Sequence, residues 1–241
     1  MKRWIGMLAL AALLAAATSA LADDAVLLPD GRRLLLEAEL AGEQVRGADC
    51  EWEAIFRLDV REEGAERPFQ SLYFTTLDAF SLDEGEQRPW IKAHDVNFDG
   101  WPDLDIIYLL GASNSQHTFF FWDAEQGRFI PRNIGWAWLS SFDLLPEKGL
   151  IVNYIHDSAA TGTKEIYRWE EGKLRLVRRG EIAWSEEDGQ TLVLTVCEPD
   201  PVYGNTREIY RQELDLRTAQ AGEEAVLALD QKREELLWQG I

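Results

Sequence analysis

Short runs in which apolar and polar residues alternate follow one another along most of the chain. These runs are rich in Val, Ile, Leu, Phe, Tyr and Trp, several of which are residues that β-strands favour. Turn-forming pairs such as Gln126-Gly127 and Glu171-Gly172 separate neighbouring runs, as expected for hairpins. The predicted strands cover residues 33–38, 51–61, 71–76, 90–95, 104–110, 118–123, 150–155, 164–169, 174–178, 191–197 and 208–214. The pattern therefore predicts a mainly β protein.

The end of the chain has a different pattern. Residues 222–238 are rich in Ala, Glu and Leu, with Val226, Leu229, Leu236 and Leu237 as candidate packing residues. We therefore expect a C-terminal helix over about residues 222–238, laid on the β domain.

Two predicted hairpins resemble each other and indicate how the strands are grouped. One carries Trp122 and turns at Gly127, and the other carries Trp169 and turns at Gly172. The two tryptophans are 47 positions apart, close to the length of one propeller blade. This weak repeat favours a small, irregular β-propeller-like or barrel-like ring over a sandwich.

The N-terminus is typical of a secretory signal peptide. Lys2 and Arg3 form a basic start, residues 5–17 an apolar middle, and Ala20-Leu21-Ala22 a cleavage site. We expect residues 1–22 to be removed after Ala22, and residues 23–241 to form one domain in the periplasm or outside the cell. The apolar stretch is short for a membrane span, and no later stretch is apolar enough to cross a membrane. The alternative to cleavage is that residues 1–22 are retained as an N-terminal anchor.

The charge balance restricts the class of partner. The chain has 24 basic and 43 acidic residues, and its formal net charge is −19. Such a chain repels nucleic acid and anionic membrane surfaces, and it attracts cations and basic proteins.

The two cysteines, Cys50 and Cys197, each lie in or beside a strand-like run. An oxidising compartment favours a disulfide between them, which would join the first strands to the last. Two buried free thiols are the alternative.

Residues 95–105 read as a calcium loop. Oxygen-bearing side chains occur at loop positions 1, 3, 5 and 9, position 7 offers a backbone carbonyl, and Gly100 allows a sharp turn. The candidate ligands are Asp95, Asn97, Asp99, Trp101 and Asp103. Ile106 stands where an EF-hand has its bidentate Glu, and the loop opens directly into a strand, so this is no EF-hand. The metal-free alternative is an Asp/Asn-rich turn held by bonds from side chains to the backbone.

The chain shows no pattern that indicates catalysis. It has no HExxH pair, G-x-S-x-G elbow, P-loop or Rossmann glycine pattern. His94, His117 and His156 have no spacing that suggests zinc. We therefore predict no catalytic residues and no enzyme activity, with a pair of acidic residues acting as in glycosidases as the alternative.

One polar loop is a candidate for partner binding. Residues 153–163 run from a strand into small, flexible residues, and a loop of this kind can enter a cleft in another protein. The candidate contact residues are His156, Asp157, Ser158, Thr161 and Gly162. The alternative is a plain hairpin connection.

The calcium loop, the hairpin of Phe121 and Trp122, and the hairpin of Tyr167 together resemble a family of exported calcium-binding bacterial proteins. That family includes immunity proteins against peptidoglycan-cleaving toxins of bacterial-killing type IV secretion systems. It is similar to the periplasmic inhibitors of invertebrate-type lysozyme, which have a β-propeller-like fold. The resemblance covers about residues 71–176.

The resemblance implies a function and a type of partner. It implies a calcium-binding monomer that binds and inhibits a lysozyme-like enzyme, which the acidic composition predicts to be basic. The chain departs from many lysozyme inhibitors because it lacks their Ser-Gly-x-Tyr tetrapeptide, of which Thr161-Gly162 is a loose echo. The alternative is a carbohydrate-binding or surface-binding module that uses the loop residues Trp101, Trp136 and Trp138.

Overall fold

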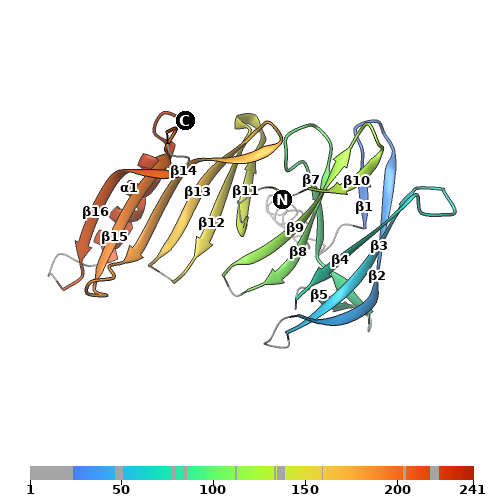
Figure 1. Cartoon of the computed structure of the whole chain (residues 1–241), viewed down its shortest axis with the longest axis horizontal. Helices are drawn as coiled ribbons and strands as arrows, with labels where there is room; N and C mark the ends of the chain where they lie inside the picture. Colours follow the sequence, from blue (N-terminus) through green and yellow to red (C-terminus); the bar gives the residue numbers. More distant parts are fainter. Residues whose placement is uncertain are drawn as a thin grey trace, which may run out of the picture.

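Three antiparallel sheets follow one another along the long axis of the molecule, and a helix lies against the third (Figure 1). This computed structural model describes residues 24–46, 51–77, 80–83, 86–111, 113–132, 134, 139–158, 160–202, 205–217 and 223–241. Within each sheet, strands that are consecutive in the sequence are also neighbours in space. Such meanders need only short turns, which explains the regular spacing of turn signals along the chain.

The first sheet contains the strands that follow the N-terminal segment. Its strands are β1 (Ala25–Leu27), β2 (Arg33–Arg46), β3 (Glu51–Glu62) and β4 (Gln70–Thr76), and a small hairpin of β5 (Phe80–Asp83) and β6 (Glu86–Pro89) follows. Every second residue of β3, namely Phe56, Leu58 and Val60, is fully buried. This alternation places one face of the sheet in a core shared with the second sheet.

The second sheet is buried on both faces. It consists of β7 (Ile91–His94), β8 (Asp103–Leu110), β9 (Ser115–Asp123) and β10 (Arg128–Pro131). In β9, Phe120 and Trp122 pack toward the first sheet, whereas Phe119 and Phe121 pack toward the third. Burial on both faces explains why β9 reads as a continuous apolar run.

The third sheet carries the helix. Its strands are β11 (Ser141–Leu145), β12 (Leu150–His156), β13 (Gly162–Glu170), β14 (Lys173–Trp184), β15 (Thr191–Pro199) and β16 (Thr206–Asp215), with the 3-10 turn η1 (Pro146–Lys148) between the first two. Helix α1 (Glu223–Trp238) buries Leu229 against Leu192 and Leu194 of β15. It also crosses β14 closely, because a Cβ atom at Gly180 would lie 2.8 Å from Cγ of Arg233.

The prediction of a mainly β chain with a C-terminal helix is confirmed. The two similar hairpins occupy corresponding places, because Trp122 pairs with Phe129 between β9 and β10, and Trp169 pairs with Leu174 between β13 and β14. Each hairpin joins the third and fourth strands of a four-strand series, β7–β10 or β11–β14. The described sheets remain open and do not close into a barrel.

The predicted bridge between Cys50 and Cys197 is wrong. Cys197 is a free, half-buried thiol in β15, whereas Cys50 lies outside the described residues. Glu51, the next residue after Cys50, begins β3 in the first sheet, and β15 belongs to the third sheet, with the second sheet between them (Figure 1). A disulfide requires Cα atoms about 4.4–6.8 Å apart, whereas the described parts of the first and third sheets pack on the second through separate clusters. Burial raises the pKa of the Cys197 thiol.

The predicted signal peptide, residues 1–22, lies outside the described residues. In the part of the chain that the structure describes, no helix has both the length and the apolar character needed to cross a bilayer.

Candidate functional site

The predicted calcium loop connects β7 to β8 as a tightly curled hairpin turn. His94 at the end of β7 pairs with Asp103 at the start of β8, so the strands are in register on both sides of the loop. Phe98 and Gly100 have positive φ angles of 59° and 88°. Glycine adopts this left-handed backbone without strain, which gives Gly100 its place at the sharp turn.

Three of the candidate ligands point into the curl. Asp95 accepts backbone N–H bonds from Asp99 at 3.0 Å through Oδ1 and from Gly100 at 2.8 Å through Oδ2. Asn97 Oδ1 accepts from the same Asp99 amide at 3.1 Å, and Asp99 Oδ1 accepts from Trp101 at 2.9 Å. The oxygens of Asp95 and Asn97 therefore converge on one backbone group.

Asp103 is the fully buried member of the set. Its carboxylate accepts backbone N–H bonds from Val96 and Trp122, both at 3.0 Å, and so ties the loop to β9. Burial raises the pKa of Asp103 to about 7; the charges of Asp99 and Asp95 add to this rise, and the two backbone bonds oppose it. Asp99 and Asp95 thus repel the carboxylate of Asp103, as like charges do at short range.

The donor chemistry of the loop fits a calcium ion. The predicted set offers carboxylate, amide and carbonyl oxygens, the ligand types that Ca²⁺ prefers. In the described residues, no three side chains of Asp, Glu, His or Cys are already clustered for a metal, and both carboxylate oxygens of Asp95 accept backbone N–H bonds. A carboxylate that accepts two such bonds keeps further lone pairs. Calcium binding therefore stays a prediction, and so does the metal-free turn.

The loop between β7 and β8 also contacts the third sheet. The backbone carbonyl of Val96 accepts a bond from Trp169 Nε1 at 2.6 Å, and Phe98 packs in the same cluster. Trp101 stacks on Trp122 with ring centroids 6.2 Å apart. Trp101 is therefore a packing residue, and Trp136 and Trp138 lie outside the described residues.

A polar cluster that sequence analysis missed lies behind the loop. Asp105 is buried, and its Oδ1 lies 2.5 Å from His117 Nδ1, while its Oδ2 lies 3.3 Å from His94 Nε2. Burial alone would raise the pKa of Asp105, but the bonds to His117 and His94 outweigh it and lower that pKa. The available signal was an ionisable residue inside the apolar run 104–110.

Ser115, His117 and Asp105 contact one another in the order of a Ser-His-Asp triad, and the cluster also contacts the third sheet. Ser115 Oγ lies 2.8 Å from His117 Nε2 and also donates to the backbone carbonyl of Ser140 at 2.9 Å. Phe142 of β11 covers the His117 ring, with centroids 5.2 Å apart. The cluster joins the second sheet to the third, and it lines neither of the two cavities described below.

The predicted partner-binding residues form the tight turn between β12 and β13. The Asn114 side chain donates to the His156 carbonyl at 2.7 Å and accepts from the His156 amide at 2.8 Å. Ser158 Oγ accepts backbone bonds from Ala160 at 3.2 Å and Thr161 at 3.1 Å. The turn is thus held by the neighbouring sheet and by its own side chains.

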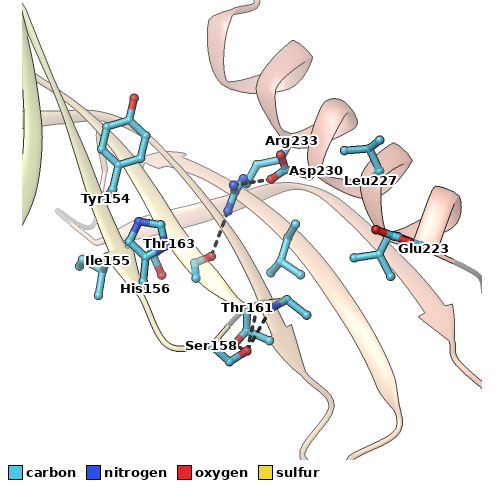
Figure 2. Close-up of a pocket in the computed structure, with 14 residues that line it drawn as sticks. Tyr154, Ile155, His156, Ser158, Thr161, Thr163, Glu223, Leu227, Asp230 and Arg233 are labelled. Atoms are coloured by element: carbon cyan, nitrogen blue, oxygen red, sulfur yellow. Dashed lines mark hydrogen bonds and ion pairs between the residues drawn. The ribbon is translucent and has the colours of Figure 1, made fainter. Parts of the chain in front are cut away.

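Four of the five predicted contact residues line a cavity of about 500 Å³, namely His156, Ser158, Thr161 and Gly162 (Figure 2). Asp157 is exposed beside them but does not line it. Helix α1 forms the facing wall with Glu223, Val226, Leu227, Asp230 and Arg233, which sequence analysis did not connect with this turn.

The loop and the turn lie at opposite ends of one strand. Asp103 begins β8, and Asn114, which holds His156, follows the end of that strand. Eight strand residues rise by roughly 23 Å from first to last. The predicted metal loop and the cavity are therefore separate places on the molecule.

No protein-family model matches the chain, and no curated protein matches its sequence significantly. One solved structure that matches is described as "Structure of a Xanthomonas Type IV Secretion System related protein". The match has 13% sequence identity and a TM-score of 0.49, and it covers 78% of this chain and 98% of that chain. At this level of similarity the match assigns no function.

Proposed function

We propose that the protein is an exported, calcium-binding monomer that binds and blocks a peptidoglycan-cleaving, lysozyme-like enzyme. Its role would be that of an immunity protein against a secreted toxin. The contact surface would be the turn of residues 156–162 together with the cavity beside it. The protein would act by occupying the enzyme and not by catalysis of its own.

The observation that carries this proposal is the preformed turn beside a cavity. Asn114 holds both backbone groups of His156, and Ser158 closes the tip through two backbone bonds. A turn that is already ordered loses little conformational entropy on binding, so more of its contact energy appears as affinity.

The charge of the chain supports a basic partner. The formal net charge of −19 creates a field that steers a positively charged protein toward this one. Such steering raises the association rate most strongly at low salt. We therefore expect the rate of complex formation to fall as salt is added.

In this proposal calcium would supply positive charge among Asp95, Asp99 and Asp103. These side chains, with Asn97 and the Trp101 carbonyl, would hold the ion at the start of β8. Through Val96 and Trp169, the loop would keep the second and third sheets in their relative positions.

The test is inhibition of peptidoglycan cleavage by the purified protein. Suitable enzymes are an invertebrate-type lysozyme and any lysozyme-like enzyme encoded beside this gene. We expect inhibition that Asp157→Arg weakens at least about tenfold, because an interface residue at the centre of a contact contributes most. Glu125→Arg makes the same charge change in the exposed turn between β9 and β10, away from the turn of residues 156–162. This control variant should retain inhibition. Full activity of every enzyme in the presence of excess protein would refute the proposal.

A second function, glycan binding, is favoured by one observation. A groove of about 700 Å³ runs over the open side of β14, β15 and β16, and its lining includes Trp184, which is 42% exposed. Exposed aromatic rings beside hydroxyl and carboxylate groups suit sugar binding, and Thr191 and Thr195 lie in the same groove. Calorimetric titration with soluble peptidoglycan fragments tests it, because binding that Trp184→Ala abolishes would favour this function over the first.

A further inference from the structure

The cavity between helix α1 and the turn of residues 156–162 has an apolar interior. Ile182 of β14, Val226 and Leu227 of α1, and Ala160 of the turn contribute to its lining. Leu227 remains 56% exposed although it lines the cavity. Figure 2 shows Leu227 on the helix side and Ser158 and Thr161 on the turn side. Leu227 thus extends the apolar lining to the surface, and continuous exposed apolar surface with a polar rim marks interaction sites.

The rim of the cavity favours positive charge. Arg233 is the one Lys or Arg in the lining, and its guanidinium is engaged by Asp230 and by the Gly162 carbonyl at 3.1 Å. Glu223 lines the cavity and makes no ion pair with any residue that the structure describes. Asp157 stands exposed at the turn, and it likewise has no ion pair within the described residues. One carboxylate of the helix wall and one on the turn beside the cavity therefore remain available to a cation.

The helix wall is held firmly to the sheet. Lys164 Nζ of β13 donates to Glu234 Oε2 at 2.5 Å, and Arg178 Nη1 of β14 donates to the carbonyls of Leu236 at 2.7 Å and Gln239 at 2.8 Å. Leu237 is fully buried, and Gly180 allows the close approach of Arg233. Because the wall is anchored at several points, the cavity exists before a ligand arrives.

We propose that this cavity receives an apolar side chain of the protein partner that is flanked by Lys or Arg. Leu227 and Val226 would pack against the apolar side chain, while Glu223 and Asp157 would pair with the basic neighbours. The identity of that partner as a peptidoglycan hydrolase rests on the proposed function. A central apolar anchor with charged groups around it is the usual composition of a strong contact.

The probes are three short peptides that separate the apolar contribution from the charge. Each has acetyl and amide ends: Gly-Lys-Leu-Leu-Lys-Gly, Gly-Glu-Leu-Leu-Glu-Gly and Gly-Lys-Ser-Ser-Lys-Gly. Binding is followed by backbone amide NMR shifts of the purified protein as it is after export. We expect the first peptide to bind and to shift resonances of residues 154–163 and α1, and the other two to bind at least about tenfold more weakly.

Two variants and one matched control locate the site. Leu227→Lys, at an exposed position, should abolish binding of the first peptide. Glu223→Lys should weaken it by roughly two- to fivefold, the usual effect of one exposed ion pair. Glu224→Lys makes the same charge change at the next residue of the helix, which does not line the cavity, and should leave binding unchanged.

The outcomes separate this inference from the proposed function. Equal binding of the three peptides, shifts that lie elsewhere on the protein, or equal effects of Glu223→Lys and Glu224→Lys would each overturn the inference. If the protein inhibits a hydrolase and Leu227→Lys inhibits as well as the parent, the function stands and the inference fails. If the basic apolar peptide binds as described and no hydrolase is inhibited, the inference stands and the function fails.

Discussion

At the scale of single residues, the predicted calcium loop depends on a side chain with a structural role and a proposed metal-binding role. Asp95 organises the turn by accepting two backbone bonds, and it is also a candidate ligand. Replacing it by Ala would remove both roles at once. Replacing it by Asn removes the charge and one of the two acceptor oxygens but keeps the other, so that variant disturbs the turn less than Ala does.

We predict that Asp95→Asn reduces the stabilisation of the protein by calcium. A ligand present at about 100 times its Kd stabilises the folded state by about 2.7 kcal/mol, and most of this should be lost. In chelator the variant should melt near the temperature of the parent, because weaker repulsion of Asp103 offsets the loss of one of the two backbone bonds. Thermal melts with calcium and with chelator measure both effects. An equal melting temperature of the parent protein in the two conditions would contradict calcium binding.

Asn114 is the residue that holds the binding turn. We predict that Asn114→Ala lowers the free energy of unfolding by about 1–2 kcal/mol, since it removes two hydrogen bonds to the backbone of His156. Amide hydrogen exchange at residues 155–162 should accelerate by more than exchange elsewhere in the third sheet. Uniform acceleration across the sheet would show that Asn114 does not support the turn specifically.

At the scale of elements, the packing of α1 on β14 depends on Gly180, which has no side chain. A Cβ atom at Gly180 would lie 2.8 Å from Arg233 Cγ and 3.3 Å from Leu237 Cδ1. The helix itself has few buried side chains, Leu229 and Leu237 among them. Its position is therefore sensitive to any displacement at this crossing.

We predict that Gly180→Ala destabilises the protein by about 1–3 kcal/mol, the usual cost of inserting a methyl group into a close contact. Hydrogen exchange of α1 should increase at the same time. Gly42→Ala is the matched control, because a Cβ atom there has no neighbour within 4 Å. Urea denaturation of both variants measures the difference, and equal stability of the two would contradict the predicted crowding.

At the scale of the whole molecule, the order of the sheets decides which distant residues can meet. The first and third sheets each pack on the second, through separate clusters of buried side chains. Residues of the first sheet are thereby kept away from β15. This arrangement explains why the strands that carry or follow the two cysteines do not meet.

We predict that the protein purified without reductant contains two titratable thiols after denaturation, one each from Cys50 and Cys197. Adding reductant should leave its melting temperature unchanged, because there is no bridge to break. Thiol titration and thermal melts measure these outcomes. Fewer than two thiols, together with a lower melting temperature in reductant, would show that the disulfide forms and would contradict this prediction.

The alternation of apolar residues and the turn signals predicted eleven of the strands, the C-terminal helix and the tight turn between β7 and β8, but not β1, β5, β6, β10 or β11. These features depend on neighbours in the sequence: side chains alternate along a strand with a period of two, and a Gly at loop position 6 permits the turn wherever the loop lies. The sequence by itself also indicated the polar turn of residues 156–162. Only the tertiary structure placed α1 opposite that turn, brought His94 and His117 onto Asp105, and separated β3 from β15. Those relations join residues far apart in the chain, and they follow from how three sheets share their buried faces, which no local pattern records.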